Sequence, residues 1–302
     1  ALGIDSTTIE ANASMKSIVR KDSGKGWKDY ARKLAKKAGL DDPTDDELRQ
    51  FDRNRPGKKV SNDDWESPSD PDSRITRMKD GTTKLAYKAE HAVDLESDIV
   101  VSATVHPGTA ADTDTVIDTA IDAAVNLERA GCEREVEAIV ADKGYHSAKV
   151  VTLADELGIR TYIPERKSPT MRRWTDKDPA AKDAVYATRR RTRGEHGKKL
   201  SRQRSELVER TFAHVCDTGG ARHTWLRGLV SVTKRHLMVV AARNLSVIMR
   251  SLFGIGTPRG LQGHCALARL AWTHMKRLLI ALEAVIGRLV NQLFRWPIGA
   301  GA

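Results

Sequence analysis

Glu137-Ala-Ile-Val-Ala-Asp-Lys-Gly-Tyr-His-Ser147 is a short apolar segment that runs into an acid and a turn. Its apolar residues predict a buried strand that ends at Asp142, and Ser147 is placed to cap a following helix. Residues 158–164 then predict a second strand. Such a strand–helix–strand unit is typical of parallel pairing, and α/β sheets place their chemistry at the carboxyl ends of strands. Asp142 is therefore a candidate functional acid, although an aspartate also commonly opens a turn.

Further strands are predicted before this unit. Residues 2–10 predict an apolar strand that carries Asp5, and residues 84–94 and 99–105 predict a β-hairpin. Polar and apolar residues alternate with period two over 84–94, which predicts a strand with one solvent-exposed face. Together with the parallel unit, the hairpin predicts a mixed sheet.

Helical periodicity separates and follows these strands. Apolar residues recur at helical spacing from 112 to 129, where Asp112 or Thr113 is expected to be the cap. Three later segments also predict helices: 198–216, 229–252 and 266–294. The last is amphipathic and carries Lys and Arg, so a docking or dimer helix is favoured over a helix on a membrane surface. The predicted fold class is α/β, a mixed sheet flanked by helices.

The predicted domain organisation has one main domain and a tail. Residues 1–252 form the domain, and 253–302 a helical C-terminal extension. Within the domain, 14–80 is a polar, proline-punctuated insertion with little capacity to form a core. Residues 165–204 form a basic segment.

Composition restricts the functional classes. The chain has 302 residues, 30% of them charged, and no apolar run of the about 18 residues that a membrane span requires. Its three cysteines are widely spaced, which argues against a disulfide framework or a zinc site and favours a reducing, cytoplasmic compartment. The net charge is +11, and residues 165–204 hold fourteen Lys and Arg against five acids. Such a block indicates a polyanion partner or, alternatively, a solvated basic loop.

Three acids are candidate metal ligands: Asp5, Asp142 and Glu209, the last on the helix predicted over 198–216. Carboxylates gathered at a sheet edge suit Mg²⁺ or Mn²⁺. Two such ions about 4 Å apart can activate an attacking hydroxyl and stabilise a leaving oxygen in phosphodiester chemistry. Because the chain has 40 acids, the residues alone do not single out this triad.

Three motifs in order resemble the DDE transposases of bacterial insertion sequences. Gly3-Ile4-Asp5-Ser6-Thr7 is similar to their first-aspartate motif, and Ala141-Asp142-Lys143-Gly144-Tyr145 is similar to the second. Arg204-Ser205-Glu206-Leu207-Val208-Glu209 with Phe212 resembles their glutamate helix. The similarity covers about residues 1–250.

The resemblance implies an RNase H-like fold in which Asp5, Asp142 and Glu209 bind two Mg²⁺ or Mn²⁺ ions. It implies cleavage of phosphodiester bonds at the ends of an insertion sequence and transfer of those ends to target DNA. Glu206 remains the alternative third ligand, whereas the Val-Glu-x-x-Phe pattern favours Glu209. The expected DNA contacts are Lys143, Tyr145, His146, Arg189, Arg190, Arg191, Arg202, Arg204 and Arg210.

The partners that follow are double-stranded DNA, as transposon ends and target, and a second copy of the chain in an active homodimer. No membrane partner is expected, and the location is the bacterial cytoplasm, at the nucleoid when DNA is bound. The chain opens at Ala1 inside a strand-like segment, so an upstream portion is expected to be missing. Two alternatives stay open: an inactive DNA-binding remnant, and a nuclease that cuts without joining strands.

Overall fold

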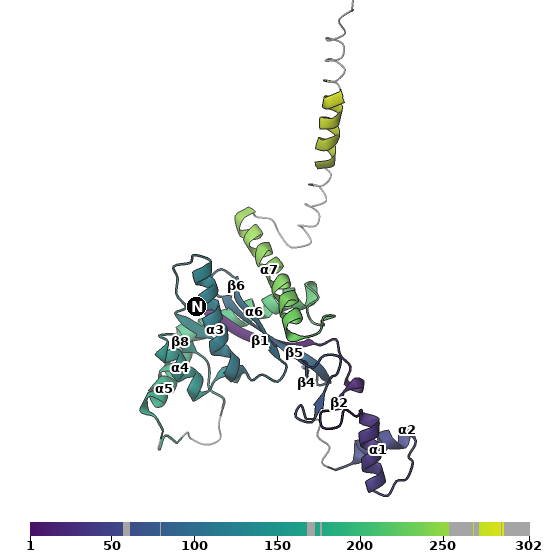
Figure 1. The fold of residues 1–302 in the computed structure, drawn as a ribbon. Coiled ribbons are helices and arrows are strands. Elements are labelled where there is room, and N and C mark those ends of the chain that lie inside the picture. Colours follow the sequence, from purple (N-terminus) through teal and green to yellow (C-terminus); the bar gives the residue numbers. More distant parts are fainter. Residues whose placement is uncertain are drawn as a thin grey trace, which may run out of the picture. The chain divides into compact units, whose positions relative to one another are not determined.

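A computed structural model describes residues 1–56, 61–78, 80–167, 173–175, 177–253, 268, 272–284 and 286 (Figure 1). The chain divides into two compact units, Ala1–Asn244 and Leu245–Ala302. The first unit contains every strand that the structure describes. In the second, residues 272–284 are helical, within the segment predicted as the helix 266–294, and the rest of that prediction beyond 286 lies outside the described residues.

The centre of the main sheet is β1 (Leu2–Glu10), which pairs antiparallel with β5 (Thr83–Asp94) and parallel with β7 (Ala138–Val140). β8 (Arg160–Tyr162) continues the sheet beyond β7, again parallel. The strand–helix–strand unit predicted around Asp142 is therefore confirmed as a parallel pair.

Two strands share the other edge of β5. β4 (Arg74–Arg77) pairs with its first residues, and β6 (Val100–Pro107) pairs with the remainder as the predicted hairpin. In the described part of the chain the main sheet thus has six strands of mixed direction. A separate two-stranded sheet joins β2 (Val19–Arg20) to β3 (Trp65–Glu66).

Helices cover both faces of the main sheet. The described helices are α1 (Trp27–Lys37), α2 (Asp45–Asn54), α3 (Asp112–Arg129), α4 (Ala148–Glu156), α5 (Pro179–Arg193), α6 (Glu195–Phe212) and α7 (Leu229–Phe253). Of these, α3 and α4 pack on one face of the main sheet and α6 and α7 on the other. Short helical turns are η1 (Met15–Ser17), η2 (Lys143–Tyr145) and η3 (Ala213–Thr218), the last a π-helical turn. None of the helices in the described residues has the length and apolarity of a membrane span.

Alternating residues of the strands build the two cores. On one face, Ile4 and Ile139 pack with Val116 of α3 and Val150 of α4. On the other face, α6 and α7 contribute Val208 and Val240 to a cluster that also contains Val93 and Val100 of the sheet. A mixed sheet between two helical layers is the RNase H-like arrangement that the motifs implied.

The insertion after β1 has more structure than its composition indicated. α1 and α2 enclose a small apolar cluster of Ala31, Ala35 and Leu48, and α2 begins with a capping box between Thr44 and Glu47. β4, from the end of the same segment, joins the main sheet. This core is small, because the helix pair buries only two alanines and one leucine.

Two local predictions also differ from the structure. The basic segment contains α5, whose buried face of Ala184, Val185 and Thr188 is too narrow to stand out in an arginine-rich sequence. α3 has Ala111 as its cap, without a side-chain bond, and starts at Asp112. The Asp112 carboxylate does not cap the helix because it bonds Ser6 and Lys88 instead.

Candidate functional site

Asp5 and Asp142 belong to neighbouring parallel segments of the main sheet. In the parallel pair of β1 and β7, Gly3 lies opposite Val140. Asp5 follows Gly3 by two residues within β1, and Asp142 follows Val140 by two residues, just beyond the end of β7. Asp5 thus lies within β1 and Asp142 directly after β7, the parallel neighbour of β1, and a shared role for the two acids stays a prediction.

The Asp5 carboxylate is held from two sides. Its Oδ1 accepts a bond from the backbone N–H of Ser6 at 2.8 Å, and its Oδ2 lies 2.9 Å from Nη2 of Arg204. Arg204 is 8% exposed and also donates through Nε and Nη2 to the carbonyl of Ile4. This arginine ties α6 to residues 4 and 5 of β1 and places a positive charge beside the Asp5 carboxylate.

Gly3 permits this close approach of α6. A Cβ at Gly3 would lie 2.7 Å from Cδ2 of Leu95, 3.1 Å from Val208 and 3.2 Å from Arg204. A larger residue would therefore press on the side chains through which α6 touches β1. The close packing of α6 on β1 therefore explains why the first motif has a glycine at position 3.

The Asp142 segment is a tight turn. Asp142 accepts a bond from the N–H of Gly144 at 2.6 Å and opens η2. Arg166 donates to the carbonyls of Lys143 and Gly144, which ties this turn to the chain beyond β8. Asp142 and Lys143 are exposed and His146 is partly exposed, so these side chains border the sheet edge.

Tyr145 has a different position from the one expected. It is 1% exposed, and its hydroxyl donates to Oε1 of Glu90 at 3.0 Å inside the protein. Burial raises the pKa of the phenol, and the nearby Glu90 carboxylate raises it further. A DNA contact for Tyr145 does not fit this burial, and we assign its side chain to the interior.

The two candidate glutamates of α6 are both exposed. Glu206 lies 3.7 Å from Arg210 one turn later, and Arg210 also reaches Asp98. Glu209 follows the buried Val208. Among the residues described, no group of three or more His, Cys, Asp or Glu is arranged to hold a metal ion. Asp5, Asp142 and Glu209 are thus not gathered into a three-ligand site, and the metal role of Glu209 stays a prediction.

Of the six arginines expected to bind DNA, Arg204 is 8% exposed and bound to Asp5, which does not fit a DNA contact, and Arg210 contacts Asp98 and Glu206. The other four fall into two groups. Arg189 pairs with Glu165 at 2.6 Å, and Arg191 donates to the carbonyl and hydroxyl of Thr161. Burial lowers the pKa of Arg191. Arg190 and Arg202 have exposed side chains. The second group is better placed than the first to meet a phosphate backbone.

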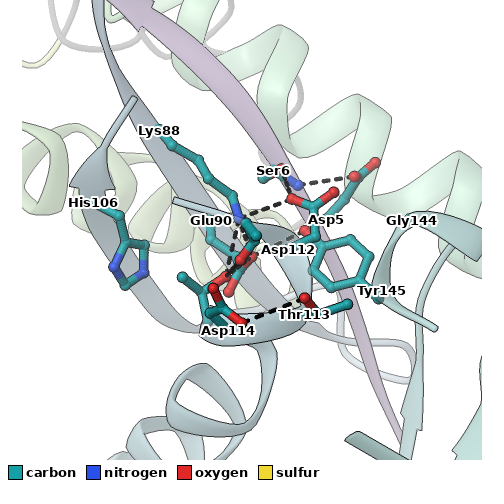
Figure 2. Close-up of polar contacts among 12 residues, drawn as sticks. Asp5, Ser6, Lys88, Glu90, His106, Asp112, Thr113, Asp114, Gly144 and Tyr145 are labelled. Carbon is teal, nitrogen blue, oxygen red and sulfur yellow. Dashed lines mark hydrogen bonds and ion pairs between the residues drawn. The ribbon is translucent and has the colours of Figure 1, made fainter. Parts of the chain in front are cut away.

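Behind the sheet edge lies a polar network that sequence reasoning missed (Figure 2). Lys88 and Glu90 project from β5 toward α3 and are 5% and 0% exposed. The period-two pattern of residues 84–94 located both side chains on one face, but the prediction that this face is wet was wrong because α3 covers it. The sequence did contain a signal for this network: a lysine and a glutamate two residues apart on a strand next to the strand that carries Asp5.

The family comparison covers most of these features. The family model described as "Transposase DDE domain" matches residues 64–245, more than half of the chain. The match includes Asp142, Glu209 and the Lys88–Glu90 strand, whereas Asp5 lies before it. The comparison with curated proteins gives no match.

Proposed function

The chain belongs to the family of transposase DDE domains, and from that membership we propose that it cleaves DNA at the ends of an insertion sequence and joins those ends to target DNA. The observation that supports the proposal is the parallel pairing of β1, which carries Asp5, with β7, which Asp142 follows by two residues. The side chains of the two aspartates supply hard oxygen donors, the ligand type that Mg²⁺ and Mn²⁺ prefer. The donor chemistry of this pair fits a divalent metal centre.

We propose that Asp5, Asp142 and Glu209 hold two such ions. When bound, these ions supply an activated hydroxyl and stabilise charge on the leaving oxygen of a phosphodiester. The chain's own residues do the rest. Arg204 balances the charge of Asp5 and holds α6 against β1 at Ile4. Arg190, Arg202 and Lys143 offer exposed positive charge to the phosphate backbone.

The test is metal-dependent nicking of supercoiled plasmid, comparing the chain with Asp142→Asn. Nicking in Mn²⁺ by the first and not by the second, with equal DNA affinity, is the expected result. Equal nicking by both proteins would contradict a role for Asp142. A strand-joining assay with labelled DNA ends then separates a transposase from a nuclease that only cuts.

Glu206 and Glu209 form a matched pair for the third ligand. Both are exposed acids on α6 and differ by three positions. Glu209→Gln is expected to abolish nicking, and Glu206→Gln to preserve it. The opposite outcome would move the third ligand to Glu206.

An inactive DNA-binding remnant is the second candidate. It is favoured by the ion pair between Asp5 and Arg204 and by the lack of a three-ligand group in the described residues. DNA binding without nicking in either Mg²⁺ or Mn²⁺ would support it.

Homodimer formation, binding to element ends and association with the nucleoid are proposed for the active form, and cross-linking on end DNA would test the dimer.

A further inference from the structure

Glu90 is a carboxylate in the interior with four donors around it. Its Oε1 accepts from the hydroxyls of Thr115 at 2.9 Å and Tyr145 at 3.0 Å, and its Oε2 accepts from Thr119. Nζ of Lys88 lies 3.3 Å from Oε1. A carboxylate has about four acceptor positions, so Glu90 is fully bonded although no part of it is exposed.

A buried ion pair is weak support for stability by itself. Removing two charges from water has a large free-energy cost, and apolar residues of similar volume often serve a core as well or better. The position of this pair is more informative than its energy, because it reaches the Asp142 turn through Tyr145 and the Asp5 strand through Asp112 and Ser6.

The network contacts β1 directly beside Asp5. Lys88 Nζ bonds Oδ1 of Asp112 at 2.8 Å, and the same oxygen accepts from the hydroxyl of Ser6 at 3.2 Å. Ser6 is also the cross-strand partner of Glu90. Figure 2 shows Ser6 and Asp112 close to Asp5, with Lys88 and Glu90 behind them.

The network contacts the Asp142 turn at two places. Tyr145, three residues after Asp142, donates its hydroxyl to Glu90. A Cβ on Gly144 would lie 2.8 Å from Oδ1 of Asp142 and 3.0 Å from Oδ2 of Asp112, so these two carboxylates flank the same glycine. The turn is therefore held from inside by Tyr145 and bordered by Asp112.

We propose that Glu90, with Lys88 as its counter-ion, is a positioning residue that keeps the Asp142 turn in register with Asp5 through Tyr145, Asp112 and Ser6. The proposal rests on the proposed function for its consequence, because the register matters most if the two aspartates share divalent ions. Residues behind metal ligands commonly change metal affinity or activity by about 10- to 100-fold when they are replaced.

The test variant is Tyr145→Phe, which removes one oxygen and keeps the ring in the core. Its control is Tyr87→Phe, because Tyr87 is also fully buried and donates its hydroxyl to a carboxylate, Asp70, at 2.6 Å. Each protein is measured for Mn²⁺ affinity by calorimetry well below its melting temperature, and for backbone amide exchange over residues 143–146 without metal. Glu90→Gln is a second variant, since it puts an N–H donor among the hydroxyls.

Tyr145→Phe is expected to weaken Mn²⁺ binding about 10-fold or more and to speed amide exchange in the turn. Because each variant removes one buried hydrogen bond, both are expected to lower the melting temperature by similar amounts. Tyr87→Phe is expected to leave the Mn²⁺ affinity within about twofold and the amide exchange of the turn unchanged. Equal effects of both variants on the turn, or unchanged exchange in Tyr145→Phe, would overturn the proposal.

The design separates this proposal from the proposed function. If the unaltered chain binds Mn²⁺ no better than Asp142→Asn does, the metal site fails, and the metal-free exchange data still decide whether Glu90 and Tyr145 hold the turn. If Mn²⁺ binds but plasmid is not nicked, the proposed cleavage fails, and the affinity ratio of the two tyrosine variants still decides the positioning role.

Discussion

At the residue scale, a pair of histidines lies between the sheet and α7. Nε2 of His91 is 2.7 Å from Nε2 of His236, and the His91 ring stacks on Phe212 with 4.2 Å between ring centroids. Neither Nδ1 atom has a hydrogen-bond partner among the described residues. Burial lowers the pKa of both imidazoles, that of His236 to about 4, and each is also opposed by an arginine charge, Arg243 for His91 and Arg235 for His236.

This pair predicts acid sensitivity of the fold. Because the folded pKa of His236 lies below its unfolded value of 6.5, the unfolded chain binds more protons below that pH. The free energy of unfolding therefore decreases as the pH is lowered. The contribution is complete above pH 6.5 and is lost progressively down to pH 4. Between pH 7.5 and pH 5 the loss of stability due to His236 is roughly 2 kcal/mol, and urea unfolding at these two pH values measures it.

A matched substitution identifies the group. His236→Leu is expected to remove this share of the pH dependence, whereas His223→Gln, at an imidazole whose side chain is 57% exposed, is expected to retain it. If His236→Leu shows the same loss of stability between pH 7.5 and pH 5 as the unaltered chain, other groups cause the acid sensitivity.

At the scale of elements, the junction of α5 and α6 depends on one close approach. A Cβ on Gly197 would lie 2.2 Å from the carbonyl oxygen of Arg191 and 3.0 Å from Cα of Thr192. Both contacts are with backbone, which cannot rotate away. Gly194 is the N-cap of α6 with φ −69°, and a Cβ there would lie 3.6 Å from its nearest neighbour, the carbonyl oxygen of Arg191.

Gly197→Ala is therefore expected to destabilise the fold by about 1–3 kcal/mol, because overpacking forces the two helices apart. Gly194→Ala has no such clash and is expected to cost less than about 1 kcal/mol, the usual range for a change at a helix cap. Urea midpoints at constant m-value provide the comparison. Equal midpoints for the two variants would mean that the α5 backbone relaxes around the added methyl group.

Elements with a regular apolar pattern were predictable from the sequence. The helix predicted over 112–129 has those bounds in α3, and Ser147 caps α4 as expected. α5 was missed because its core contact uses alanine, valine and threonine within an arginine-rich run. Period-two alternation correctly gave β5 as a strand, but alternation alone does not show which face another element will cover.

The candidate site was predictable to the same depth. Strand patterns predicted Asp5 on a strand and Asp142 directly after one, and the structure has Asp5 within β1 and Asp142 two residues after β7. The partner of Asp5, Arg204, was not predictable as such, because the contact depends on how α6 crosses the sheet at Gly3. The role of Tyr145 was missed for a similar reason: its polar hydroxyl finds a buried carboxylate that only the folded sheet supplies.

At the scale of the whole molecule, the net charge of +11 and the isoelectric point of about 9.6 favour a polyanion partner. Charge alone does not locate the binding surface, because basic residues also occur far along the chain from the site. Lys36 and Lys37 are exposed at the end of α1, and Arg190 and Arg202 are exposed on α5 and α6. These two pairs carry equal charge and allow the location to be tested.

If DNA lies along α5 and α6, replacing Arg190 and Arg202 with Gln removes two phosphate contacts, whereas replacing Lys36 and Lys37 with Gln removes only net charge. Each phosphate contact contributes about 0.9 to the slope of log affinity against log salt concentration. The arginine variant is therefore expected to bind more weakly at low salt and to have a slope shallower by about 2. The lysine variant should keep the original slope when DNA binding is measured by fluorescence anisotropy between about 50 and 200 mM salt. Equal slopes for both variants would show that the basic helices add to long-range attraction without contacting the phosphates, and the binding surface would then have to be sought elsewhere in the chain.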